Sequence, residues 1–148
     1  CIRDRFGFDP KVAFVSHSTF GQPLTSRTKH IKEAVEILKE KKVDFEFDGD
    51  MQPDVALNEE YKSLYPFSKI VGNANILIMP GQHSAAISYK MMKTLGDIKV
   101  IGPLLIGLGL PIEIAPLRSS TSEIINLASI AAYSADVINY KKNYWVKN

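Results

Sequence analysis

The stretch Val12-Ala13-Phe14-Val15-Ser16-His17-Ser18-Thr19-Phe20-Gly21 decides the fold. Its first four residues are all apolar, which is typical of a strand buried on both faces. The loop that follows offers the hydroxyls of Ser16, Ser18 and Thr19 and the flexible Gly21 at the carboxyl end of that strand, where ligand sites often lie. These groups suit a phosphate or another polar ligand, although an ordinary capped turn explains the same residues.

Downstream of this stretch the pattern alternates between helices and strands. Thr25 or Ser26 is expected to cap a helix whose apolar residues, Ile31, Ala34, Val35 and Leu38, follow helical spacing. A short strand at Phe45–Phe47 is expected to end in a turn at Asp48-Gly49-Asp50, with Pro53 opening the next segment. A second buried strand is predicted over 74–79, closed by Pro80-Gly81, and then a helix that Gly96 ends.

The last third of the chain is expected to add two buried segments and a helix. Residues 100–108 are apolar and glycine-punctuated, which predicts a buried segment, and residues 112–115 predict a short strand. The final helix is expected to begin near Ser120 and to run toward Tyr140. The sequence therefore predicts one α/β domain over 1–148, a three-layer α/β/α sandwich with a mostly parallel sheet.

The composition is that of an ordinary globular protein and narrows the possible partners. Of the 148 residues 45% are hydrophobic, and the formal net charge of +2 predicts no nucleic-acid partner. The apolar runs are too short to cross a bilayer, and a single cysteine, Cys1, favours a reducing compartment, so we expect a cytoplasmic protein with no membrane partner. The opening residues 1–10 resemble the end of a preceding element, which predicts further domains upstream.

A second candidate site lies where the final helix begins. Arg118, Ser119, Ser120 and Thr121 place a cation and hydroxyls beside the free N–H groups of a helix start, which attracts phosphate. Ser120 and Glu123 also have the spacing of a capping box, so both side chains are equally explained as caps. The three histidines have no metal-ligand spacing, the glycines after 100 form no dinucleotide fingerprint, and the aspartates at 48, 50 and 54 are assigned to a turn. No metal or other cofactor is predicted in this chain.

Taken in order, several stretches make the chain resemble the phosphate acetyl/butyryltransferase family from Val12 onward, over the carboxyl-terminal portion of that family. They are VAFVSHSTFG (12–21), DFEFDGDMQPDVALN (44–58), VGNANILIMP (71–80), AAISYKMMKTLG (85–96), IGPLLIGLGLP (101–111) and SEIINLASIAAYSA (122–135). The resemblance implies an isocitrate/isopropylmalate-dehydrogenase-like subdomain. The sequences of these stretches are most similar to those of the module attached to bacterial malic enzymes.

For transferase chemistry the resemblance implies a cleft in which arginines neutralise phosphate and an aspartate helps to deprotonate the thiol of coenzyme A. The family's aspartate falls on Glu123, which is the catalytic residue if this chain is part of an active transferase. Phe20 stands where transferases generally carry a lysine. The segment before the last helix is one residue shorter than in the family, so we expect the side chain of Arg118 to point in a different direction. We therefore expect this fragment alone not to turn over acetyl phosphate.

For a malic enzyme the resemblance implies that malate is oxidatively decarboxylated in upstream domains with NAD(P) and Mg or Mn. This chain would then bind acetyl-CoA, or a related phosphorylated small molecule, as an effector and would hold a homo-oligomer together. Two alternatives stay open. One is the catalytic half of a phosphate acetyltransferase, and the other is an assembly platform in which Met91, Met92, Tyr133 and Trp145 contribute to a subunit surface.

Overall fold

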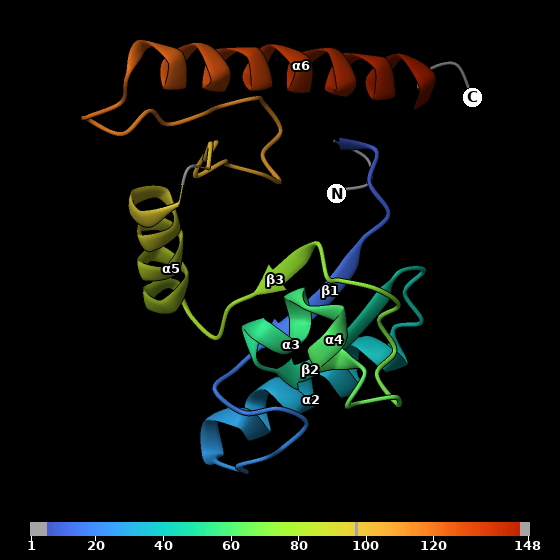
Figure 1. Cartoon of the computed structure of the whole chain (residues 1–148). Coiled ribbons are helices and arrows are strands. Elements are labelled where there is room, and N and C mark those ends of the chain that lie inside the picture. Colours follow the sequence, from blue (N-terminus) through green and yellow to red (C-terminus); the bar gives the residue numbers. More distant parts are fainter. Residues whose placement is uncertain (1–5, 97, 146–148) are drawn as a thin grey trace. The chain divides into compact units, whose positions relative to one another are not determined.

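The computed structural model describes residues 6–96 and 98–145, with side chains described as far as Val137 (Figure 1). The chain divides into two compact units, Cys1–Lys90 and Met91–Asn148. The order of elements is β1 (Lys11–Val15), α2 (Ser26–Glu40), β2 (Glu46–Met51), α3 (Pro53–Leu57), α4 (Glu59–Lys62), β3 (Ile76–Ile78), α5 (Gln82–Leu95) and α6 (Thr121–Trp145). The two units are described separately below.

The first unit is built on a three-stranded parallel sheet in the order β2-β1-β3. The apolar run that predicted a buried strand is therefore the central strand. Both neighbours run parallel to β1, and α2 forms the crossover between β1 and β2. Because β2 and β3 lie on opposite sides of β1, the strand order reverses at β1, and a crevice is expected at that point along the carboxyl ends of the strands.

Helices cover both faces of this sheet. Ala13 belongs to the main core cluster together with Val55 and Ala56 of α3. Its neighbour Phe14 instead shares a cavity wall with Ile31 of α2. Because successive side chains of a strand point to opposite faces, α3 and α2 lie on opposite faces of the sheet. The predicted α/β architecture with a parallel sheet is confirmed.

Helix α2 begins as its sequence predicts. The side chain of Thr25 accepts a hydrogen bond from the backbone N–H of Thr28 at 3.3 Å, and the Thr28 hydroxyl accepts one from the backbone N–H of Thr25 at 2.8 Å. This reciprocal pair satisfies two donors at the helix start. Val35 is the buried apolar residue of the helix, at 2% exposure.

The prediction of a turn at Asp48-Gly49-Asp50 is wrong, since these residues lie within β2. Asp48 and Asp50 are buried because other segments supply hydrogen-bond donors to their carboxyl groups, as Lys69 N–H does to Asp48 Oδ2 at 2.8 Å. Gly49 is required for close strand pairing, because a Cβ at this position would lie 2.7 Å from the Cβ of Phe14. Tertiary contacts therefore override the turn propensity of this tripeptide.

In the second unit α6 begins at Thr121, close to the predicted start, and α5 ends where Gly96 donates its N–H to the carbonyl of Met92 at 2.9 Å. The predicted strand over 112–115 is wrong, because these residues pair with no strand among those described. Most of residues 100–108 are exposed, so the predicted burial is wrong as well. An apolar pattern alone produced both predictions, and the described residues of this unit contain no sheet to receive either segment.

Substitution of Met51 is expected to test the core of the first unit. Met51 is fully buried against Ala13, Val55 and Ile70. Met51→Ala should lower the free energy of unfolding by about 2–5 kcal/mol, because it removes buried methylenes and leaves a cavity. Ile37→Ala, at an exposed position of α2, should change it by about 0.5 kcal/mol or less. Urea unfolding followed by circular dichroism measures both, and equal effects would contradict this assignment of the core.

Candidate ligand-binding site

The predicted loop Ser16–Gly21 is fastened to β2 by one buried carboxyl group. Asp50, at 1% exposure, accepts a hydrogen bond from the Ser18 hydroxyl at Oδ2 and one from the Gly21 N–H at Oδ1, the latter at 3.0 Å. Thr19 Oγ1 accepts the N–H of Gln52 at 3.2 Å. The hydroxyls of Ser18 and Thr19 therefore hold the loop in place, which is the capped-turn interpretation of these residues.

Phe20 belongs to an aromatic cluster beside this loop. Its ring centroid lies 4.8 Å from that of Phe67 and 5.5 Å from that of Tyr65. The backbone of Phe20 has a φ of 49°, which is uncommon for a residue other than glycine. An aromatic side chain thus occupies the loop position at which the family resemblance leads us to expect a cation.

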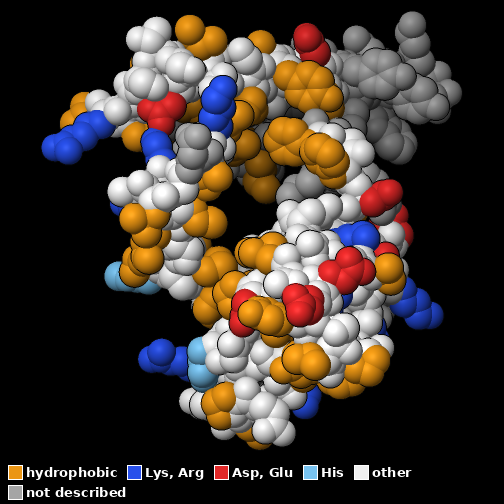
Figure 2. Space-filling view, in the orientation of Figure 1, with side chains coloured by type: hydrophobic (Ala, Val, Ile, Leu, Met, Phe, Trp, Pro, Cys, Tyr) orange, Lys and Arg blue, Asp and Glu red, His pale blue; other side chains and the backbone are white. Residues whose placement is uncertain are grey.

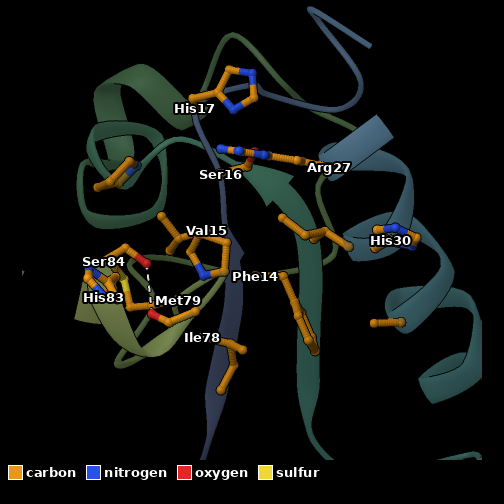
Figure 3. A pocket seen from close by; sticks show the side chains of 15 residues that line it. Phe14, Val15, Ser16, His17, Arg27, His30, Ile78, Met79, His83 and Ser84 are labelled. Carbon is orange, nitrogen blue, oxygen red and sulfur yellow. Dashed lines mark hydrogen bonds between the residues drawn. The ribbon is translucent and has the colours of Figure 1, made fainter. Parts of the chain in front are cut away.

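A cavity of about 850 Å³ opens beside the loop, at the carboxyl ends of β1 and β3 (Figure 3). Of the predicted loop residues, Ser16 lines it and Ser18, Thr19 and Gly21 do not. Arg27 reaches toward Ser16 from α2, while His83 and Ser84 face the cavity from the start of α5. Sequence reasoning missed Arg27, His30 and His83, and the only available signals were the helical spacing of 27, 30, 31 and 34 and the Pro80-Gly81 break after β3.

The predicted helix-mouth residues lie in the second unit. Ser120 and Glu123 form the predicted capping box: the Ser120 N–H donates to Glu123 Oε2 at 2.7 Å, and the Glu123 N–H donates to Ser120 Oγ at 3.3 Å. Glu123 also accepts a hydrogen bond from the ammonium group of Lys93. Arg118, Thr121 and Ser120 are exposed and Ser119 is half-buried, and Arg118 makes no hydrogen bond or ion pair within the described part of the chain.

The carboxyl group of Glu123 is a weak base. The hydrogen bond from Lys93, followed by those from the Ser120 N–H and hydroxyl, lowers the pKa of Glu123 from 4.5 to about 2. A carboxylate with so low a pKa accepts a proton from a thiol poorly. The two groups of predicted site residues lie in different units, and their participation in one site stays a prediction.

No group of three or more His, Cys, Asp and Glu side chains is placed to hold a metal ion in residues 6–96 and 98–137. No helix within the described residues is long and apolar enough to cross a bilayer.

Comparison with known proteins settles the family. The family model described as phosphate acetyl/butaryl transferase matches residues 2–132. The chain belongs to this family. The resemblance that the sequence stretches indicated is therefore confirmed.

Its relatives include malic enzymes and phosphate acetyltransferases. The chain is 50% identical over 134 residues to an NADP-dependent malic enzyme of Rhizobium meliloti (strain 1021), covering 90% of this chain and 18% of that protein. It is 35% identical over 128 residues to a phosphate acetyltransferase of Clostridium acetobutylicum, covering 86% of this chain and 38% of that protein. The chain thus spans less than half the length of either relative.

Solved structures of family members share this fold. A phosphotransacetylase from Streptococcus pyogenes matches with a TM-score of 0.82 at 35% identity, over 90% of this chain and 41% of that one. EutD phosphotransacetylase from Staphylococcus aureus matches with a TM-score of 0.80 at 32% identity, over 90% of this chain and 42% of that one. The chain therefore has the fold of part of a phosphotransacetylase.

Removal of the Asp50 carboxyl group is expected to release the loop. Asp50→Ala should lower the free energy of unfolding by about 2–4 kcal/mol, because the Ser18 hydroxyl and the Gly21 N–H lose their acceptor. Asp54→Ala, at an exposed carboxyl group that accepts only the N–H of Val55, should cost about 1 kcal/mol or less. Urea unfolding gives the energies, and amide hydrogen exchange at 16–21 should accelerate in Asp50→Ala alone.

The low pKa of Glu123 predicts acid sensitivity at the start of α6. Because the folded-state pKa lies below the ordinary value, the stabilisation is fully present above about pH 4.5 and is lost as the pH falls toward 2. Carbon-13 NMR titration of the Glu123 carboxyl group should show this pKa, and Lys93→Ala should raise it. Lys29→Ala, in the other unit, serves as the control, and an equal shift in both variants would contradict the stated cause.

Proposed function

We propose that this chain is the phosphotransacetylase-like module of a malic enzyme, in which it binds acetyl-CoA as an effector and holds the subunits together. The observation that carries this proposal is the modified loop: Phe20 packs against Tyr65 and Phe67, and the neighbouring hydroxyls of Ser18 and Thr19 are hydrogen-bonded within the chain. The 50% identity to an NADP-dependent malic enzyme supports the same choice.

The chemistry of thiol activation argues against catalysis by this chain. A general base works best when its pKa lies near the working pH, and the pKa of Glu123 is about 2. The carboxylate is also engaged by Lys93 and by Ser120. A module that binds the family's ligand without transferring the acyl group fits these constraints better than an active transferase does.

In the full-length protein the proposal assigns catalysis to domains outside this chain. There, malate is oxidatively decarboxylated to pyruvate with NAD(P) and Mg or Mn. The effect of acetyl-CoA on that reaction requires that the ligand bind two states of the enzyme with different affinity. The proposal includes a cytoplasmic location and a small phosphorylated molecule as the ligand.

A second candidate function is the catalytic carboxyl-terminal half of a phosphate acetyltransferase, converting acetyl phosphate and coenzyme A into acetyl-CoA and phosphate. The exposure of Arg118 favours it, because its guanidinium group has no partner within the described residues and is available to a phosphate. Arsenolysis of acetyl phosphate by the full-length protein, abolished by Arg118→Ala, would establish this function.

A third candidate is a purely structural platform for assembly. Met91, Met92 and Tyr133 are each about half exposed, at 54%, 51% and 52%, which suits a subunit surface. The side chain of Trp145 lies outside the described residues. Apolar side chains also reach the surface elsewhere on each unit (Figure 2). Sizing the protein in solution tests this candidate, because a clean monomer would count against it.

Titration of the full-length protein with acetyl-CoA tests the main proposal. Acetyl-CoA is expected to bind and to change the rate of malate oxidation at a subsaturating malate concentration. Coenzyme A without its acetyl group is the matched ligand control for the acyl requirement. Malate oxidation that is unaffected by acetyl-CoA, together with an absence of binding in calorimetry, would remove the regulatory claim.

A further inference from the structure

The cavity beside the loop lies where a small-molecule site is expected in a parallel sheet. It is bounded by Ser16 and His17 after β1 and by Met79 to Ser84 after β3, at the position where the strand order reverses. Its volume of about 850 Å³ is within the range of sites that hold a nucleotide-sized ligand. All of its lining residues belong to the first unit.

Arg27 is the permanently charged side chain among the residues that line this cavity. Arg27 and the histidines at 17, 30 and 83 line it, and no Asp or Glu is among its lining residues. Arg27 is exposed and makes no hydrogen bond or ion pair with the rest of the described chain. Its five N–H donors are therefore available, and a phosphate group is the ligand that matches a guanidinium fork.

The start of α5 adds backbone donors on the other side of the cavity. Gly81 precedes the helix and has no side chain with which to cap it, and His83 and Ser84 line the cavity in the first turn (Figure 3). Among the described residues no acceptor is found for the N–H groups of 82, 83 and 84, whereas the starts of α2 and α6 are capped by Thr25 and Ser120. Uncapped helix N–H groups complement an anion, which strengthens the case made by Arg27.

The remaining wall of the cavity is apolar. Phe14 and Ile78 from the sheet and Ile31 and Ala34 from α2 provide it. A ligand that is only an anion would leave this surface unused. A molecule that combines phosphate groups with a flat heterocyclic ring can contact both the guanidinium group of Arg27 and the apolar wall.

We propose that this cavity binds the phosphate-bearing nucleotide portion of the effector, with Arg27 and the start of α5 on the phosphates and the apolar wall against the ring. The inference rests on the proposed function, and it assigns the nucleotide end of acetyl-CoA to residues outside the serine–threonine loop and the helix mouth. Arg27 is the residue that determines affinity for the phosphate groups.

Calorimetric titration of the full-length protein with adenosine 3′,5′-bisphosphate tests the site directly, because this probe carries the nucleotide phosphates without the acyl chain. Arg27→Ala is expected to weaken binding of the probe and of acetyl-CoA at least tenfold, and Arg27→Lys to retain part of the affinity. Lys32→Ala removes one positive charge from an exposed position of the same helix that does not line the cavity, and it should leave both affinities unchanged.

A second variant tests the cavity by volume instead of charge. Ala34→Trp places a large ring in the cavity from an exposed position of α2, and it should abolish binding of the bisphosphate while the far-ultraviolet circular dichroism is retained. Wild-type affinity for the bisphosphate in Arg27→Ala and Ala34→Trp, or no binding to the wild type, would overturn this assignment. Bisphosphate binding that depends on Arg27, together with malate oxidation unaffected by acetyl-CoA, would support the cavity and overturn the regulatory function.

Discussion

The first unit depends on the buried carboxyl group of Asp50. It lies near the end of β2 and accepts donors from Ser18 and Gly21, which belong to the loop that leaves the neighbouring strand β1. A buried carboxyl group is costly unless its oxygens are hydrogen-bonded, and the loop supplies a donor to each oxygen of Asp50. The same contact therefore stabilises the sheet edge and fixes the course of the chain between β1 and α2.

The shape of the cavity follows from this constraint. With Ser18 turned toward Asp50, its neighbours Ser16 and His17 line the cavity. The loop leads into α2, which begins after the Thr25 cap, and Arg27 lies in the first turn of that helix. The hydroxyls of Ser18 and Thr19 are thus used in hydrogen bonds within the chain, while Ser16 lines the cavity together with Arg27 of α2. Ligand binding by the loop residues stays a prediction.

The sequence predicted correctly those features that are formed between residues close together in the chain. The Thr25 cap of α2 and the Ser120–Glu123 box of α6 each depend on neighbouring residues, and each is found as expected. The apolar run of β1 also marks its strand correctly, although that strand is held by partners distant in the sequence. Asp48-Gly49-Asp50 has the composition of a turn, yet Lys69 and the loop after β1 supply donors to its carboxyl groups from 21 or more positions away in the sequence. Arg27 and His83 come together only through the strand order, which no spacing in the sequence reveals.

Binding and catalysis make different physical demands. The described residues provide donors for a ligand but a poor base for catalysis. Binding a phosphorylated ligand requires donors whose hydrogen bonds are not used within the protein, and Arg27, Arg118 and the start of α5 provide such donors. Transfer of an acyl group requires in addition a base whose pKa matches the proton that it removes. The resemblance gives the position of that base to Glu123, and hydrogen bonds from Lys93 and Ser120 lower its pKa to about 2. These electrostatics support the proposal that the module recognises a ligand without converting it.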